Sequence, residues 1–234
     1  MCIRDRLWRA PAALPAPPAA GWDTAAYWAF IDRVQARMDA LWNEAQGAYS
    51  PAQSMVQANM LLTHAVAALA GHQGPARRDD RAARIADQLC RPPWFAATSA
   101  PDSDQRHVPG WLDGSVQHLV IDEQVAYGLT VAWQARDALR LPAELSARMA
   151  DCIVRTTLGR YWRYPTIRLN QIGWYCRMYT CAVTVGGPRD LFSDFMRQVR
   201  RFVDEAKRPG RGRDVPNLGP GYRFHYLPSA RASA

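Results

Sequence analysis

One predicted helix carries an unusual group of polar and aromatic side chains at its start. The segment RLNQIGWYCRMYTCAVTV becomes regularly apolar only after its first two turns, which hold Asn170, Gln171, Trp174, Tyr175 and Arg177. A helix that only fills a core does not need an amide pair, two large rings and a cation at one end. Amide donors can stabilise an oxyanion, and aromatic faces stack on the C–H faces of sugars. The pattern therefore favours a carbohydrate site, although Asn170 would also serve as an ordinary helix N-cap.

A second polar group lies in the Gly- and Pro-rich segment 209–234. It contains Tyr222, Arg223, His225 and Tyr226 within the sequence GPGYRFHY. A neutral imidazole can act as a general base near neutral pH, and a phenol can donate a proton. The alternative for all of these side chains is ordinary loop packing.

The two groups together resemble the catalytic half of polysaccharide lyases of the chondroitin/hyaluronan lyase type. The similarity by motif runs from NQIGWYCRMYTCAVTVGGPRDLFSDFMRQV to GPGYRFHY, or Asn170 to Tyr226. In that family a helix begins with a catalytic Asn, a second helix follows, and a loop with glycine and an aromatic residue delivers a catalytic His. The resemblance implies an incomplete α/α toroid followed by β-sheet domains, with Asn170 and His225 at the centre of the site.

The implied reaction is β-elimination in a uronic-acid-containing polysaccharide, without a cofactor or a metal. Asn170 would stabilise the charge that develops on the uronate carboxylate, and His225 would remove the neighbouring proton. Tyr226 and Tyr222 are the candidates for protonating the leaving oxygen. The expected substrate-binding residues are Gln171, Trp174, Tyr175, Trp111, His107 and Arg223, with Arg211 and Arg213 as further cations. Gln171 departs from the family pattern, which has an arginine at that position.

A glycoside hydrolase is the nearest rival among enzymes. The segment DQRHVPGWLDGSVQHLVIDEQ offers Asp113 together with Asp122 or Glu123 as the two carboxylates that such a reaction requires. His118 and Asp122 lie four residues apart and would share one helical face, but no third ligand follows at a helical interval, so we expect no metal site. The alternative is a capped helix start with solvated acidic residues.

Most of the chain from residue 22 to 208 is predicted to be helical, in successive antiparallel hairpins. The apolar spacing and the capping residues predict helices over 23–45, 51–70, 79–89, 116–139, 142–158, 170–185 and 190–207. Asp23 is the expected N-cap of the first helix, and Ser50 and Pro51 are expected to begin the second. No strand pair is expected, and 90–114 is predicted to be a long loop. The fold class is therefore all-α, as an incomplete α/α toroid.

Several conspicuous residues have a simpler structural interpretation. His64 is expected in the core, Asp79 and Asp80 at a salt-bridged helix entrance, and Cys90, Cys152, Cys176 and Cys181 as small buried side chains. Trp28, Trp42 and Trp133 are likewise assigned to the core.

The whole-chain composition leaves a third function open. The net charge is +8, and 28 of the 29 cations are arginines. A non-catalytic helical module that binds polyanions would use such a surface. We expect an acidic polysaccharide as the partner of a monomer, and neither a nucleic acid nor a membrane.

The ends of the sequence suggest a fragment. MCIRDR resembles an adapter-derived artefact, the Pro/Ala-rich segment up to residue 21 is a linker pattern, and LPSARASA ends without a closing element. We expect the full-length protein to be extracellular or periplasmic.

Overall fold

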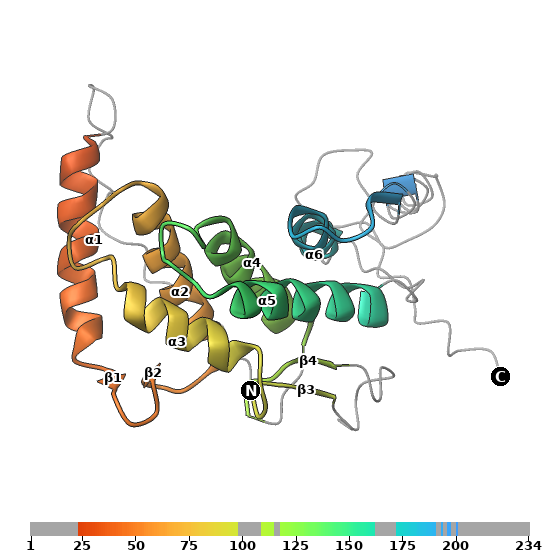
Figure 1. Cartoon of the computed structure of the whole chain (residues 1–234), viewed down its shortest axis with the longest axis horizontal. Coiled ribbons are helices and arrows are strands. Elements are labelled where there is room, and N and C mark those ends of the chain that lie inside the picture. Colours follow the sequence, from red (N-terminus) through yellow and green to blue (C-terminus); the bar gives the residue numbers. More distant parts are fainter. Residues whose placement is uncertain are drawn as a thin grey trace, which may run out of the picture.

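The computed structural model describes residues 23–97, 109–114, 118–161 and 172–190, with residues 193, 196, 197 and 200. These residues form a mainly helical fold (Figure 1), as the sequence predicts. The helices are α1 (Thr24–Asp39), α2 (Ser54–Leu69), α3 (Asp79–Leu89), α4 (Leu119–Gln134), α5 (Ala143–Thr156) and α6 (Ile172–Thr184). Thr157–Tyr161 continues α5 as a π-helical turn. The predicted segments 1–21, 98–108, 201–207 and 209–234 lie outside the described residues.

Helix α4 is the centre of the packing. It lies between α2 and α6, while α3 and α5 pack across these helices and against each other. Gly128 of α4 permits the close approach of α2, because a Cβ there would stand 2.6 Å from the carbonyl oxygen of Ala58. The apolar residues Ile121, Val125 and Leu129 of α4 are buried. One continuous apolar core therefore joins α2 to α6.

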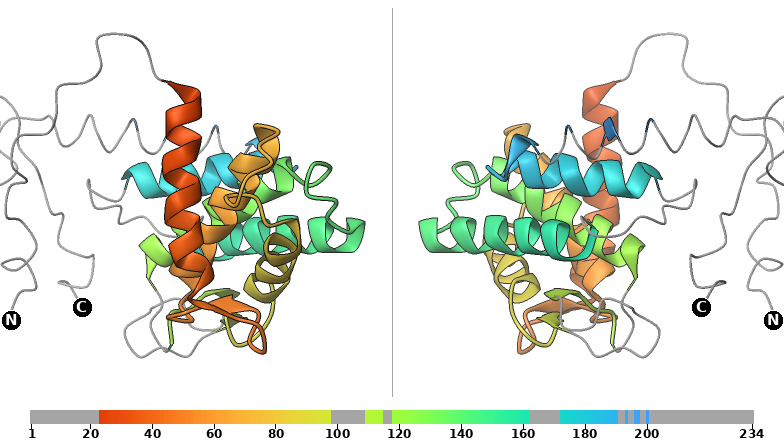
Figure 2. Two further views of the ribbon diagram at one scale, coloured as in Figure 1. Left: turned by 90° about the vertical axis from the view of Figure 1, so that its left-hand side faces the viewer. Right: turned by 90° about the vertical axis from the view of Figure 1, so that its right-hand side faces the viewer.

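Helix α1 lies at one edge of the described fold, on the opposite side from α6 (Figure 1), and its axis is steeply inclined to those of α5 and α6 (Figure 2). Its predicted N-cap is confirmed, since Asp23 accepts hydrogen bonds from the backbone of Ala25 and Ala26 at 2.9 and 3.2 Å. The helix ends at Asp39, six residues before its predicted end at residue 45. A turn replaces its last part.

That turn contains one of two strand pairs that the sequence prediction missed. Strands β1 (Trp42–Asn43) and β2 (Ala48–Tyr49) pair antiparallel, in the register Trp42↔Tyr49. Asn43 accepts a hydrogen bond from Gln46, and Gly47 adopts a φ of +63°. This local turn chemistry overrides the helical spacing of the apolar residues.

The second pair lies within the predicted loop 90–114. Strands β3 (Phe95–Ala97) and β4 (Pro109–Trp111) are antiparallel, with Phe95 opposite Trp111. Their pairing is supported by Trp111, which donates from its backbone to Asp122 and from Nε1 to the carbonyl of Leu89, both at 2.7 Å. Strands of three residues leave no alternation that a sequence pattern could reveal.

Helix α2 begins at Ser54, so the prediction that Ser50 and Pro51 begin it was wrong. Gln53 occupies the N-cap position without a side-chain cap. Asp113 supplies the cap from a distance, since its Oδ1 accepts from the backbone and hydroxyl of Ser54 at 2.5 and 2.6 Å. The end is close to the prediction, with Gly71 at a φ of +66°. The start of α2 is thus tied to the segment that leads into α4.

The predicted helices over 79–89, 116–139, 142–158 and 170–185 are confirmed to within about five residues, whereas only residues 190, 193, 196, 197 and 200 of the predicted helix 190–207 are described. The predicted range 79–89 coincides with α3, while α4, α5 and α6 are slightly shorter than predicted. Within the described residues, no helix combines the length and the apolar character that crossing a membrane would need.

Candidate functional site

The described residues include three of the predicted site residues. Trp111, Trp174 and Tyr175 lie within them. The remaining predicted residues fall outside them: His107, Asn170, Gln171, Tyr222, Arg223, His225 and Tyr226, together with Arg211 and Arg213.

Trp174 lies in the first turn of α6 and is half-buried. Its ring meets His118 edge-on, with the ring centroids 6.3 Å apart and the planes at 74°. His118 is the exposed N-cap of α4, where its Nδ1 accepts a hydrogen bond from the backbone of Val120 at 3.2 Å. The starts of α4 and α6 are therefore neighbours.

One turn further along, α4 and α6 are joined by an ion pair. Arg177 Nη1 lies 2.6 Å from Glu123 Oε1, and the Arg177 guanidinium stands 4.8 Å above the centre of the Tyr127 ring. The Glu123 side chain is only 3% exposed, whereas that of Arg177 is 48% exposed. Burial raises the pKa of Glu123, and Arg177 offsets part of that effect.

These contacts create a surface with a defined chemistry. We call this surface the α4–α6 edge; it consists of His118, Glu123, Tyr127, Trp174 and Arg177. It presents an aromatic ring and a partly exposed guanidinium that a buried carboxylate and a second ring hold in place. An aromatic face beside a cation can bind a sugar ring that carries a carboxylate.

Trp111 and Tyr175 belong to the core. Trp111 is fully buried, and Tyr175 is 4% exposed. Burial in this structure leaves neither ring with a face toward solvent, so the expected stacking surface reduces to Trp174 among the described candidates.

The three acidic residues of the hydrolase hypothesis are engaged in different contacts. Asp113 caps α2 through Ser54, and the fully buried Asp122 accepts from the backbone of Trp111. Glu123 pairs with Arg177. Asp122 is thus committed to the β4 backbone, while His118 caps α4. Within the described parts of the chain, no three His, Cys, Asp or Glu side chains gather in a way that could hold a metal ion.

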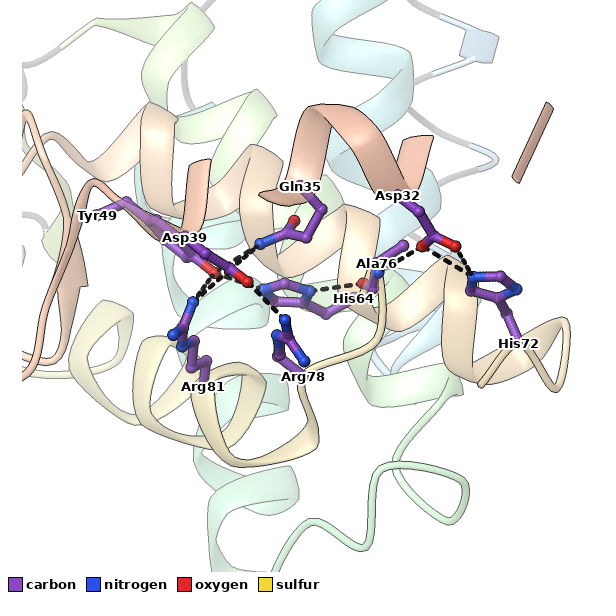
Figure 3. Close-up of polar contacts among 9 residues, drawn as sticks. All are labelled: Asp32, Gln35, Asp39, Tyr49, His64, His72, Ala76, Arg78 and Arg81. Carbon is purple, nitrogen blue, oxygen red and sulfur yellow. Dashed lines mark hydrogen bonds and ion pairs between the residues drawn. The ribbon is translucent and has the colours of Figure 1, made fainter. Parts of the chain in front are cut away.

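A buried polar network, which the sequence analysis did not predict, connects α1, β2, α2 and α3 (Figure 3). His64 Nδ1 lies 2.8 Å from the carbonyl of Ala76, and its Nε2 lies 3.2 Å from the Tyr49 hydroxyl. The carbonyl requires a proton on Nδ1, so Nε2 accepts from the hydroxyl. That hydroxyl in turn accepts from Gln35 and Arg81, each at 3.1 Å. Burial lowers the pKa of His64 to about 4.

Asp39 closes this network at the end of α1. It accepts from Arg78 and Arg81 at 2.5 Å and from Gln35 at 2.7 Å. His64, Tyr49 and Gln35 are at most 1% exposed, whereas the side chains of Arg78, Arg81 and Asp39 are 35%, 18% and 20% exposed. The buried part of the network confirms the prediction that His64 is a packing residue, and its ion pairs tie the end of α1 to α3.

The other structural interpretations are mostly confirmed. Arg77 pairs with Asp79 at the start of α3, and the cysteines 90, 152 and 181 are buried. Trp42 and Trp133 are half-buried against the core. Trp28 is half-buried and stacks on His72 at 4.3 Å outside the apolar core, and Cys176 is only partly buried, so these two predictions were wrong.

Comparison with protein-family models, with characterised protein sequences and with solved structures finds no match to this chain.

Proposed function

We propose that this chain is the helical part of a polysaccharide lyase that cleaves a uronic-acid-containing polysaccharide by β-elimination. The α4–α6 edge would form part of its substrate site. The observation that carries the proposal is the exposed Arg177 guanidinium, fixed between Glu123 and Tyr127 near Trp174. The chain passes directly from Asn170 and Gln171 into this helix.

The arrangement of the helices supports a toroid. Helices α2, α4 and α6 are neighbours in one layer, while the intervening helices α3 and α5 lie outside them (Figure 1). The starts of the three inner helices also belong to one end of the fold. Asp113 contacts the start of α2, His118 begins α4, and Trp174 of α6 contacts His118. An inner layer with its helix starts gathered at one end is what a toroid groove requires.

The proposed reaction breaks the C5–H and C4–O bonds of the uronate and forms a C4–C5 double bond. Asn170, helped by Gln171, donates hydrogen bonds to the uronate carboxylate and so stabilises the negative charge that develops there. Neutral His225 takes the C5 proton, the C4–O bond breaks, and the electron pair forms the C4–C5 double bond. Tyr226 or Tyr222 gives a proton to the leaving oxygen. Arg177 and Trp174 hold a sugar unit of the polymer.

The contacts favour elimination over hydrolysis. Hydrolysis needs two carboxylates on opposite sides of the scissile bond. Asp113 and Asp122 bind backbone groups of the fold, and Glu123 is buried beneath Arg177. Elimination needs instead a base, a proton donor and a group that stabilises the carboxylate. The chain offers candidates for all three.

The test is a panel of hyaluronan, chondroitin, alginate and xanthan, followed by the ultraviolet absorbance of the unsaturated uronate. The protein is assayed both as this chain and as the complete gene product. We expect absorbance to rise on at least one polymer, and to fall by about 100-fold or more in Asn170→Ala and in His225→Ala. Arg177→Met should raise KM by about 10-fold.

Arg136→Met is the matched control for Arg177→Met. Arg136 also stacks on an aromatic ring, that of Trp133 at 4.1 Å, but it lies beyond the opposite end of α4. Its loss should leave KM unchanged. Reducing ends without ultraviolet absorbance would instead indicate hydrolysis, and absorbance that survives in His225→Ala would remove His225 from the mechanism.

A further inference from the structure

A surface hollow outside the α4–α6 edge has the composition of a ligand site. It has a volume of about 380 Å³ and lies between the β1–β2 turn and the end of α3. The size falls within the range of small-molecule pockets, roughly 300–1,000 Å³. Its apolar lining includes Pro92, Pro93 and Trp94, and its polar lining is Gln46, Gln88 and Arg91. One large ring among a few polar groups is typical of sugar sites.

The Trp94 ring stands on a well-fixed backbone. The Trp94 backbone donates to the carbonyl of Arg91 at 3.1 Å, and its own carbonyl accepts from Leu112 at 3.0 Å. The side chain is partly buried against the core, which leaves part of the ring at the surface. A half-exposed ring on a rigid segment loses little entropy when a ligand stacks on it.

The polar side of the hollow is also held in place. Gln88 Nε2 donates to the carbonyl of Gln46 at 2.5 Å, which ties the β1–β2 turn to α3. Arg91 is the only charged residue among the eight that line the hollow, and its side chain is 55% exposed. Asp87 lies 2.9 Å from Arg91 and also binds Arg148, so one carboxylate serves two guanidinium groups. The local charge therefore favours an anionic ligand.

The hollow belongs to the same end of the fold as the α4–α6 edge. Ala52, in its lining, lies two residues before the start of α2. Leu112, which binds the Trp94 carbonyl, precedes Asp113, which caps α2. A second hollow of about 390 Å³ between α3 and α5 shares Arg91 with the first and is lined by Arg84 and Arg148 together with Asp87 and Glu144.

We propose that the Trp94 hollow is a sugar-binding subsite for a carboxylated unit of the polymer, remote from the bond that is cleaved. Trp94 stacks on the C–H face of the sugar ring, and Arg91 binds its carboxylate. This inference rests on the proposed function for the identity of the polymer. Its test measures binding alone, so that the two proposals fail separately.

The experiment measures the affinity of the His225→Ala chain for hyaluronan and for alginate by calorimetry and by electrophoresis in polymer-containing gels. We expect Trp94→Ala to weaken binding about 10-fold, and Arg91→Gln about 5-fold, on at least one of the two polymers. Trp133→Ala is the matched control, because Trp133 is another half-buried tryptophan and lies in the last turn of α4. It should bind like the parent, and circular dichroism checks that each variant is folded.

Each outcome has a distinct meaning. If folded Trp94→Ala binds both polymers within about twofold of Trp133→Ala, the subsite is refuted, whether or not the parent eliminates. If a neutral glucan binds as tightly as the two polyuronates, the role of Arg91 is wrong. If Trp94→Ala and Arg91→Gln lose binding while the complete protein never yields an unsaturated uronate, the subsite stands and the lyase proposal fails.

Discussion

At the scale of single residues, the pair of Glu123 and Arg177 is the most informative contact. Glu123 is buried and Arg177 is its cation, at 2.6 Å. Removal of Arg177 would leave a carboxylate in the protein interior without its partner, which is more costly than the loss of an exposed ion pair. We therefore expect Arg177→Met to lower the free energy of unfolding by about 2 kcal/mol at about pH 7, measured by urea denaturation.

The pH dependence of that cost has a definite sign. Burial raises the pKa of Glu123 above its usual value of 4.5, so the folded state favours the protonated carboxyl. The destabilisation exists above the raised pKa and is relieved as pH falls toward 4.5. The cost of Arg177→Met should therefore shrink at about pH 5 and be much smaller in the Glu123→Gln background. An equal cost in both backgrounds would show that the ion pair is not the cause.

His64 has the opposite pH dependence. Its pKa falls from 6.5 to about 4 because burial disfavours the charged imidazole. The folded state keeps the neutral ring, so its contribution is complete above pH 6.5 and is lost as pH falls toward 4. The parent should lose about 3 kcal/mol more stability across this window than His64→Gln. Chemical denaturation at several pH values measures this difference. The prediction is contradicted if the free energy of unfolding changes equally with pH in the two proteins.

The residue scale also shows where composition misleads. Three large aromatic residues have polar neighbours in the sequence: Trp111, Tyr175 and Trp174. Only Trp174 is partly exposed in the structure. Burial depends on neighbours far along the chain, such as Leu89 and Asp122 for Trp111. The sequence analysis singled out Glu123 as a candidate carboxylate and Arg177 as part of a polar helix start. It did not predict that they form an ion pair, because they lie on helices that are far apart in the sequence. No sequence pattern predicted that the ring of Tyr127 lies beneath Arg177.

At the scale of elements, α1 is attached through its polar face. Gln35 is its only buried residue, whereas Tyr27, Phe30 and Val34 are 46%, 55% and 42% exposed. Met38 packs against the core and Trp28 stacks on His72, and the contacts of Asp39 with Arg78 and Arg81 add to this limited packing.

This attachment makes α1 separable from the rest of the fold. We expect Asp39→Ala to speed amide hydrogen exchange in residues 24–39 by about tenfold and to leave α2 and α4 protected. Glu44→Gln is the control, because it removes a more exposed ion pair, with Arg84, beside the same helix. Equal protection of α1 in all three proteins would show that packing, and not Asp39, holds the helix.

The remote cap of α2 gives a second prediction at this scale. Asp113→Ala should lower the free energy of unfolding by about 1 kcal/mol, because the backbone N–H of Ser54 loses its acceptor. Asp113→Asn keeps an acceptor oxygen and should retain most of that stability. Thermal unfolding of the two variants decides, and equal losses would mean that the charge of Asp113, and not its hydrogen bond, is what matters.

Sequence reasoning succeeded within helices and failed at their ends. Repeated apolar spacing over several turns predicts α1 to α6, and α2 to α6 each bury apolar residues in the same core. The start of α2 depends on Asp113, which lies 59 residues away. The end of α1 depends on a turn closed by Gly47, and the paired strands have two or three residues. These features depend on contacts with residues far along the chain or on very short segments. The spacing of apolar residues does not predict either.

At the scale of the whole molecule, the starts of α2, α4 and α6 mark the end of the fold at which we propose the function. The end that gathers the starts of α2, α4 and α6 contains the α4–α6 edge, and the Trp94 hollow adjoins it. The predicted catalytic Asn170 comes just before α6 in the sequence. The helical pattern did not predict the Trp94 hollow near the start of α2. An extended acidic polymer that contacts both places would explain why a cation stands beside an exposed ring in each.

The most direct test of the account is the mass of the products that the complete protein releases from the uronate polymer it degrades. Elimination leaves an unsaturated uronate at the new non-reducing end, so each such product is lighter than the hydrolytic one by the mass of one water. The account predicts these lighter products, and their absence in His225→Ala. Products that carry the full mass of water at the new ends would contradict the lyase proposal and assign the chain to hydrolysis.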